Sequence, residues 1–274
     1  MEFLDFAGFL VIVVAAVTSI GLNILFLEQK KETRREESRR VLDPSSVGYY
    51  PGGTRGSFQL SPRRPLVVFF GDTRAQDWTA PMTTPDAQFV NRGIQRQTVA
   101  QVEGRILPHI ALLHPEAVVL QAGIHDLLNI PFLPGGEDEI VEGCIAGLAR
   151  TADELIAQRC PVILTTVIPL CAVPGERRPA WAESVTFAAH RVNAELLRMA
   201  KPGLVVFDTS ALLCGADGHV LPEYGRDIVR LNGAAYDRLN GALADLLDRV
   251  IRQRPLRAGS ERRSVGEQPA AAAR

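Results

Sequence analysis

The sequence predicts an α/β fold, a three-layer doubly wound parallel sheet preceded by one N-terminal transmembrane helix. Short apolar runs alternate with longer segments of helical periodicity. The runs are LVVFF at 66–70, AVVLQ at 117–121, PVILTTVI at 161–168 and LVVFD at 204–208. Continuous apolar runs of this length are typical of strands buried on both faces. Their alternation with helical segments favours a parallel sheet covered by helices on both sides.

The first element is an apolar segment at the N-terminus. From Phe6 to Leu27 the chain carries no charged residue. At a rise of about 1.5 Å per residue, a helix of this length crosses a hydrocarbon core of about 30 Å. Glu2 and Asp5 precede the run, whereas a cleaved signal peptide begins with basic residues and ends in small ones. We therefore expect an uncleaved transmembrane anchor at residues 6–27.

A charged segment follows the anchor directly. Its basic residues are Lys30, Lys31, Arg34, Arg35, Arg39 and Arg40, and no Lys or Arg precedes the apolar run. The positive-inside rule then places the following domain on the cytoplasmic side of the cell (inner) membrane. Interleaved glutamates allow ion pairs four residues apart, which favours a helical stalk.

The rest of the chain divides into a linker, a domain and a tail. Residues 41–64 are rich in Pro and Gly and have no apolar period, so 28–64 is predicted to be a charged stalk and flexible linker. One domain is expected at 65–252, and residues 253–274 are predicted to be a disordered tail. Helices of the domain are expected near 97–113, 138–159, 181–200 and 233–252.

Composition excludes several classes of function. The chain has 30 basic and 31 acidic residues and a net charge of -1, so no overall field favours nucleic acid. The four cysteines form no CxxC or Cys/His pattern, and no Gly-Lys-Ser/Thr loop or nicotinamide fingerprint is present in the sequence. We therefore expect no metal and no cofactor.

Four segments lie where such a sheet places its ligands, outside the carboxyl ends of the strands. They are Gly71-Asp72-Thr73-Arg74, Asn91-Arg92-Gly93-Ile94, Ala122-Gly123-Ile124-His125-Asp126 and Asp227-Ile228-Val229-Arg230-Leu231-Asn232. Their order and spacing resemble the conserved blocks of the SGNH (GDSL-type) hydrolase superfamily, with degenerate catalytic motifs. That family has Gly-Asp-Ser, an Asn-Arg-Gly-Ile-like segment, Gly-x-Asn-Asp and Asp-x-x-His. The resemblance covers residues 66 to about 240.

The resemblance implies a metal-independent serine esterase on a flavodoxin-like sheet. In the family a serine attacks an acyl carbonyl, a histidine takes its proton, and an aspartate orients that histidine. The serine amide, a glycine and an asparagine stabilise the oxyanion. Gly93 and Asp227 match the family directly. Thr73 stands at the serine position, His125 at the asparagine position and Arg230 at the histidine position.

These departures weaken the implied chemistry. Thr73 keeps a hydroxyl, but its methyl group restricts χ1. Arg230 stays protonated, because a guanidinium has a pKa above about 12, and it cannot act as a base. We expect Asp227 to form an ion pair with Arg230 as a structural strut.

Three roles remain open for His125. It could donate an N–H to the former oxyanion hole, act as a substitute base for Thr73, or be a pocket histidine without a catalytic role. Candidates for an anion-binding rim are Arg177 and Arg178, in the loop after the run 161–168, together with Arg74, Arg92 and Arg230. His219 lies among Gly, Asp and Pro residues, which indicates a surface turn.

Two functions follow from these residues. The first is a degenerate hydrolase that serves as a membrane-tethered binding or scaffolding module, with an acyl or anionic small molecule held by Arg230 and Arg74. The second is an active ester hydrolase with Thr73 as nucleophile and His125 as base, acting on an acyl ester, a thioester or an acetylated sugar. A third possibility, a domain that faces outward and modifies envelope glycans, depends on the topology.

Overall fold

The strands that the structure describes form a five-stranded sheet, and all of them are parallel. The computed structural model describes residues 2–50, 60–61, 63–80, 87–172 and 181–252. The strands are β1 (Leu66–Gly71), β2 (Gln88–Gly93), β3 (Ala117–Gln121), β4 (Val162–Thr165) and β5 (Leu204–Phe207). They lie in the order β2-β1-β3-β4-β5. The order reverses between β1 and β3, and such a switch point is where doubly wound sheets bind ligands.

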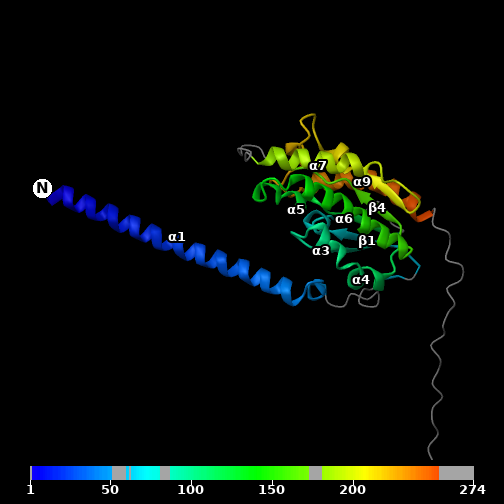
Figure 1. The fold of residues 1–274 in the computed structure, drawn as a ribbon, viewed down its shortest axis with the longest axis horizontal. Coiled ribbons are helices and arrows are strands. Elements are labelled where there is room, and N and C mark those ends of the chain that lie inside the picture. Colours follow the sequence, from blue (N-terminus) through cyan, green and yellow to red (C-terminus); the bar gives the residue numbers. More distant parts are fainter. Residues whose placement is uncertain (1, 51–59, 62, 81–86, 173–180, 253–274) are drawn as a thin grey trace, which may run out of the picture.

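Helices cover both faces of the sheet, so the predicted three-layer fold is confirmed (Figure 1). Along β1, Val68 and Phe70 face a core shared with α6 (Glu137–Ala157) and α7 (Ala182–Leu196). Val67 and Phe69 face the opposite core, which is shared with α9 (Gly233–Arg252). This alternation follows from the two-residue period of a strand, and apolar residues on both sides bury it completely.

Short helices connect these layers. They are α2 (Thr73–Gln76), α3 (Val99–Glu103), α4 (Ile106–His109), α5 (Ile124–Leu127) and α8 (Thr209–Leu213), with single 3-10 turns at Val47–Tyr49, Ala111–Leu113, Ile130–Phe132 and Pro222–Tyr224. The first turns of α2 and α5 come directly after β1 and β3. Both therefore lie at the switch point of the sheet.

The N-terminal helix α1 (Glu2–Leu42) is unbroken and extends away from the domain (Figure 1). Its stretch Leu10–Arg39 is long and apolar enough to cross a membrane, by length and composition alone. The same stretch would satisfy the requirements of a signal sequence. The expected disordered tail, residues 253–274, lies outside the described residues.

Residues 43–50 follow α1 and contact the domain. We expected this segment to belong to a flexible linker, but its backbone and side chains form hydrogen bonds with α2, α4 and the end of β2. Pro and Gly prevent a long helix here, yet they leave polar and aromatic side chains free to bind a neighbouring surface. Residues 51–59 of the expected linker lie outside the described part.

Candidate functional site

The segments singled out in the sequence meet at the carboxyl ends of β1, β2 and β3. Thr73 begins α2 and His125 lies in α5. Their side chains form a hydrogen bond, with 2.8 Å between Thr73 Oγ1 and His125 Nε2. Residues 52 positions apart in the chain are therefore joined at the switch point, where the fold class places a ligand.

The Thr73 hydroxyl has a second partner that defines its direction. The backbone N–H of Arg96 donates to Thr73 Oγ1 at 2.8 Å. Since a hydroxyl has one proton to donate, the Thr73 proton is available for His125 Nε2 when that ring is neutral and carries its own proton on Nδ1. Asp72 caps α2 by accepting the Arg74 N–H at 2.9 Å, which fixes the turn that presents Thr73.

The surroundings of His125 are cationic. Burial, and after it the charges of Arg74, Arg96 and Arg230, lower the pKa of its imidazole from 6.5 to about 4. The ring is therefore neutral at pH 7. In a serine hydrolase triad the neighbour of the histidine is a carboxylate, which stabilises the imidazolium. The charges that shift the pKa of His125 are instead those of three arginines.

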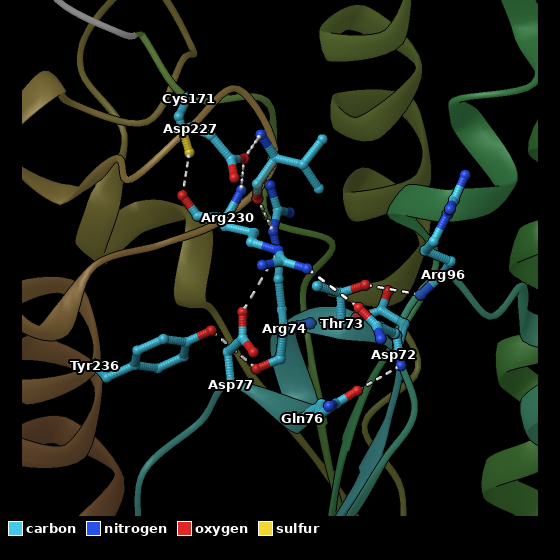
Figure 2. Close-up of polar contacts among 12 residues, drawn as sticks. Asp72, Thr73, Arg74, Gln76, Asp77, Arg96, Cys171, Asp227, Arg230 and Tyr236 are labelled. Carbon is cyan, nitrogen blue, oxygen red and sulfur yellow. Dashed lines mark hydrogen bonds and ion pairs between the residues drawn. The ribbon is translucent and has the colours of Figure 1, made fainter. Parts of the chain in front are cut away.

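The expected ion pair between Asp227 and Arg230 is wrong. Asp227 Oδ1 accepts the backbone N–H groups of Val229 at 2.8 Å and Arg230 at 2.6 Å. The Arg230 side chain instead donates to Gln95 Oε1 at 3.2 Å and lies 3.9 Å from Asp77 Oδ2 (Figure 2). The local reason is that an Asp side chain readily caps N–H groups two and three residues on.

Arg74 does not line the crevice, in contrast to our expectation. Its side chain is fully buried and donates to three backbone carbonyls, at 2.9 Å to Val229, at 2.8 Å to Pro169, and to Ile168. Buried carbonyls without other partners require donors, and the planar guanidinium supplies several in fixed directions. Arg74 contributes charge to the site but holds the surrounding loops rather than a ligand.

Arg92, the remaining candidate for the rim, is also buried. Its guanidinium lies 4.7 Å from the centre of the Tyr50 ring, an arrangement typical of a cation–π contact. Arg177 and Arg178 lie outside the described residues. Of the three rim arginines that the structure describes, Arg230 alone is partly accessible, with 34% of its side chain exposed.

Both polar groups of Gly93 already have partners. Its N–H, which the resemblance assigns to the oxyanion hole, donates to Asn91 Oδ1 at 2.8 Å. Its carbonyl accepts from Tyr50 Oη at 2.7 Å. A β-carbon at this position would lie 2.1 Å from the backbone nitrogen of Gln76. The close approach of β2 to α2 therefore requires glycine here.

We expect Gly93→Ala to lower the free energy of unfolding by at least about 2 kcal/mol, because backbone atoms of α2 must move. Urea unfolding of the full chain in detergent measures this. Gly143→Ala is the matched control, because a β-carbon there meets no atom within 4 Å and Ala is a better helix former than Gly. Equal losses in both variants would contradict the steric explanation.

The expected surface position of His219 is wrong. The residue is buried, 2% exposed, and its Nδ1 lies 3.2 Å from the Asp217 carbonyl. The next residue, Val220, forms bridges with Cys171 and Cys214. Because Val220 joins the core, the turn is drawn onto the domain and His219 is covered.

Sequence reasoning missed a cavity beside the site. It has a volume of about 870 Å³ and is lined by Asp126, Asn129, Phe132, Leu133 and Ile140, among others. Phe132, one of the lining residues, is 78% exposed. Asp126, next to His125, accepts the Val99 N–H at 2.9 Å, and burial raises the pKa of its carboxyl to about 6. Within the described residues, no cluster of His, Cys, Asp or Glu could hold a metal ion.

Comparisons with known proteins identify the fold. No protein-family model and no curated protein sequence matches the chain. Among solved structures, a GDSL-like lipase from Bacteroides thetaiotaomicron is 22% identical over 75% of this chain and 98% of its own, with a TM-score of 0.59. An acetyl xylan esterase is 15% identical over 66% and 99%, with a TM-score of 0.50. A family 3 carbohydrate esterase from Talaromyces cellulolyticus is 15% identical over 70% and 100%, with a TM-score of 0.52. The domain of this protein therefore has the fold of the SGNH (GDSL-type) hydrolases.

Proposed function

We propose that this protein is a membrane-anchored, catalytically degenerate SGNH-type module that binds an anionic small molecule at the Thr73–His125 site. The observation that carries the proposal is the cationic environment of His125, in which Arg74, Arg96 and Arg230 all disfavour the imidazolium. The same charges oppose the proton transfer of an esterase and favour an anion.

Proton abstraction from Thr73 would place a positive charge on His125. A pKa of about 4 in place of 6.5 corresponds to about 3 kcal/mol against that charge, and a base this weak is a poor match to reaction at pH 7. The Gly93 N–H is engaged by Asn91, which removes one donor from the family's oxyanion hole. The weak base impairs proton transfer, and the occupied N–H group impairs stabilisation of the oxyanion.

An anion fits the groups that remain. Arg230 is partly exposed and contacts Asp77 and Gln95. A guanidinium binds carboxylate and phosphate groups with paired donors. Arg74, which is fully buried, adds a second positive charge that acts on His125. Figure 2 shows the Arg96 side chain extending away from Thr73, so it supplies charge rather than a direct contact.

The apolar stretch of α1 supports an anchor in the cell membrane, and the basic residues after Leu27 support a cytoplasmic domain. A periplasmic reporter enzyme fused after Arg274 tests this orientation. The fusion is expected to be inactive, and an active fusion would favour a domain that faces outward.

A second candidate is an ester hydrolase in which Thr73 attacks and His125 takes the proton. The 2.8 Å hydrogen bond between them favours it, since a nucleophile and its base must lie within such a distance. The neighbouring cavity has Phe132, Leu133 and Ile140 in its lining, and apolar side chains suit an acyl group. Acyl esters, thioesters and acetylated sugars are the corresponding substrate class.

Inorganic phosphate and p-nitrophenyl acetate separate the two candidates. We expect the full-length protein in detergent to bind phosphate, and Arg230→Gln to raise the dissociation constant about 10-fold or more, because a charge-assisted hydrogen bond contributes about 1.5–3 kcal/mol. Isothermal titration measures the affinity. Arg198→Gln is the matched control, because its side chain is 69% exposed and pairs only with Glu195 among the described residues.

The ester assay compares the wild type with Thr73→Val, which keeps the shape of the side chain and removes the hydroxyl. The two proteins are expected to have the same background rate. Turnover by the wild type that disappears in Thr73→Val would refute the degenerate module and establish Thr73 as a nucleophile.

A further inference from the structure

Arg96 has an unusual backbone conformation. Its φ is +63°, in the left-handed region, which is uncommon for residues other than glycine and costs on the order of 1 kcal/mol or more. Arg96 lies in the loop 94–98, between β2 and α3, and its N–H is the group that bonds to Thr73 Oγ1. A strained residue of this kind persists where its surroundings fix it.

Several contacts that hold the loop come from α1 and from the chain that follows it. Tyr50 Oη donates to the carbonyl of Gly93, immediately before the loop, at 2.7 Å. Within the loop, Gln97 Nε2 donates to Ser46 Oγ at 3.1 Å. The Arg96 guanidinium lies 3.5 Å from the Glu36 carboxylate of α1. The loop is thus held at its beginning, at Arg96 and near its end.

A further connection passes through α2. The Gln95 N–H donates to Gln76 Oε1 at 2.7 Å, and Gln76 Nε2 donates to Tyr49 Oη at 3.0 Å. Since Tyr49 and Tyr50 are neighbours whose rings meet edge to face at 4.9 Å, one short segment supports the loop from two sides.

This segment, residues 43–50, has its own internal order and a firm attachment. The Asp43 carboxylate accepts the N–H groups of Val47 at 2.8 Å and Gly48 at 2.7 Å. His109 Nε2 lies 2.9 Å from the Ser45 carbonyl. We call residues 43–50 the docked segment. It begins directly after α1 ends at Leu42.

We propose that Tyr50 is a positioning residue for the Thr73 site, and that the docked segment transmits the position of α1 to that site. Tyr50 holds Gly93, and with Ser46 and Glu36 it keeps the loop in the conformation that presents the Arg96 N–H to Thr73. A molecule that moves α1 relative to the domain would then change the environment of Thr73 and His125. The inference concerns the geometry of the site and holds for either proposed function.

The ion pair between Arg96 and Glu36 has a minor part in this connection. Their side chains are 64% and 39% exposed, and exposed pairs of this kind contribute about 1 kcal/mol or less. Tyr50 is partly buried, bonds to a backbone carbonyl and packs on Arg92. Its removal is therefore the sharper perturbation.

The test uses the full-length protein in detergent, with carbon-13 in its histidines and no ligand. In Tyr50→Ala we expect the amides of residues 94–98 to exchange hydrogen at least about 10-fold faster than in the wild type. We also expect the pKa of His125 to rise by NMR titration, because the Arg96 charge that lowers it is no longer fixed nearby. Tyr50→Phe, which keeps the ring and loses the hydroxyl, is expected to show both changes in weaker form.

Val47→Ala is the matched control, since Val47 belongs to the docked segment and is 50% exposed. It is expected to leave both readouts unchanged. Faster exchange confined to residues 43–50, with residues 94–98 and the His125 pKa as in the wild type, would overturn the proposal. If Tyr50→Ala fails to fold by circular dichroism, the same criteria apply to Tyr50→Phe. Phosphate titration is a separate measurement, so a protein that shows the coupling and binds no phosphate refutes only the proposed ligand.

Discussion

Restoring the family residues with Thr73→Ser, His125→Asn and Arg230→His is expected to raise p-nitrophenyl acetate hydrolysis by at least about 100-fold over the wild type. A positioned general base contributes about 10² to 10⁴ in rate. The new imidazole at position 230 would stand three residues after Asp227, the family's orienting carboxylate. Arg230→His also removes the positive charge of Arg230, which opposes an imidazolium in this site.

The matched control is a second triple variant that carries Arg230→Gln in place of Arg230→His, with Thr73→Ser and His125→Asn unchanged. Arg230→Gln removes the charge of Arg230 without supplying a base. It therefore separates the effect of the lost charge from the effect of the new base. Initial rates between pH 6 and 9 measure both variants. If the Gln variant is as fast as the His variant, the missing base is not what limits the site. Because the Gly93 N–H remains bound to Asn91, full family activity is not expected.

Arg74→Met is expected to lower the free energy of unfolding by about 3–5 kcal/mol. The substitution keeps much of the side-chain volume and leaves the carbonyls of Ile168, Pro169 and Val229 without their donor. Each buried acceptor left unsatisfied costs about 1–3 kcal/mol. Thermal and urea unfolding in detergent measure the loss.

Arg198→Met is the corresponding control on the surface, where substitutions usually change stability by less than about 0.5 kcal/mol. Arg74→Lys is expected to recover only part of the loss, since one ammonium group cannot reach carbonyls that the planar guanidinium bonds in separate directions. A near-neutral Arg74→Met would show that water satisfies these carbonyls and that Arg74 is not a structural strut.

Most of the sheet could be predicted from the sequence, because β1, β3, β4 and β5 are apolar runs. The strand β2 (Gln88–Gly93) was missed. Among the described strands it lies at the edge of the sheet and pairs with β1 alone. Its residues therefore need not be uniformly apolar, and Asn91 and Arg92 break the pattern. The strand β4 ends at Thr165, earlier than expected, since the apolar residues after it pack in the core as loop.

The positions of the site could be predicted, but the directions of its side chains could not. The motifs correctly indicated that Thr73 and His125 lie at the carboxyl ends of the strands. They could not indicate that Arg74 is buried, because its acceptors include a carbonyl 155 residues away in the chain. The role of Asp227 depended on a local choice between capping N–H groups and pairing with Arg230. Hydrophobic periodicity carries no information about either outcome.

The unbroken helix α1 also determines how far the site stands from a bilayer. Glu36, which contacts Arg96, comes nine residues after Leu27, the last residue of the apolar run. If α1 crosses the bilayer upright as proposed, with Leu27 at the hydrocarbon boundary, a rise of about 1.5 Å per residue would put Glu36 about 14 Å beyond that boundary. Headgroups occupy only about 5–8 Å on each side of the core. With α1 embedded as proposed, ordinary phospholipid phosphates would fall short of Thr73, and the site would be open to dissolved molecules or to membrane molecules with extended headgroups.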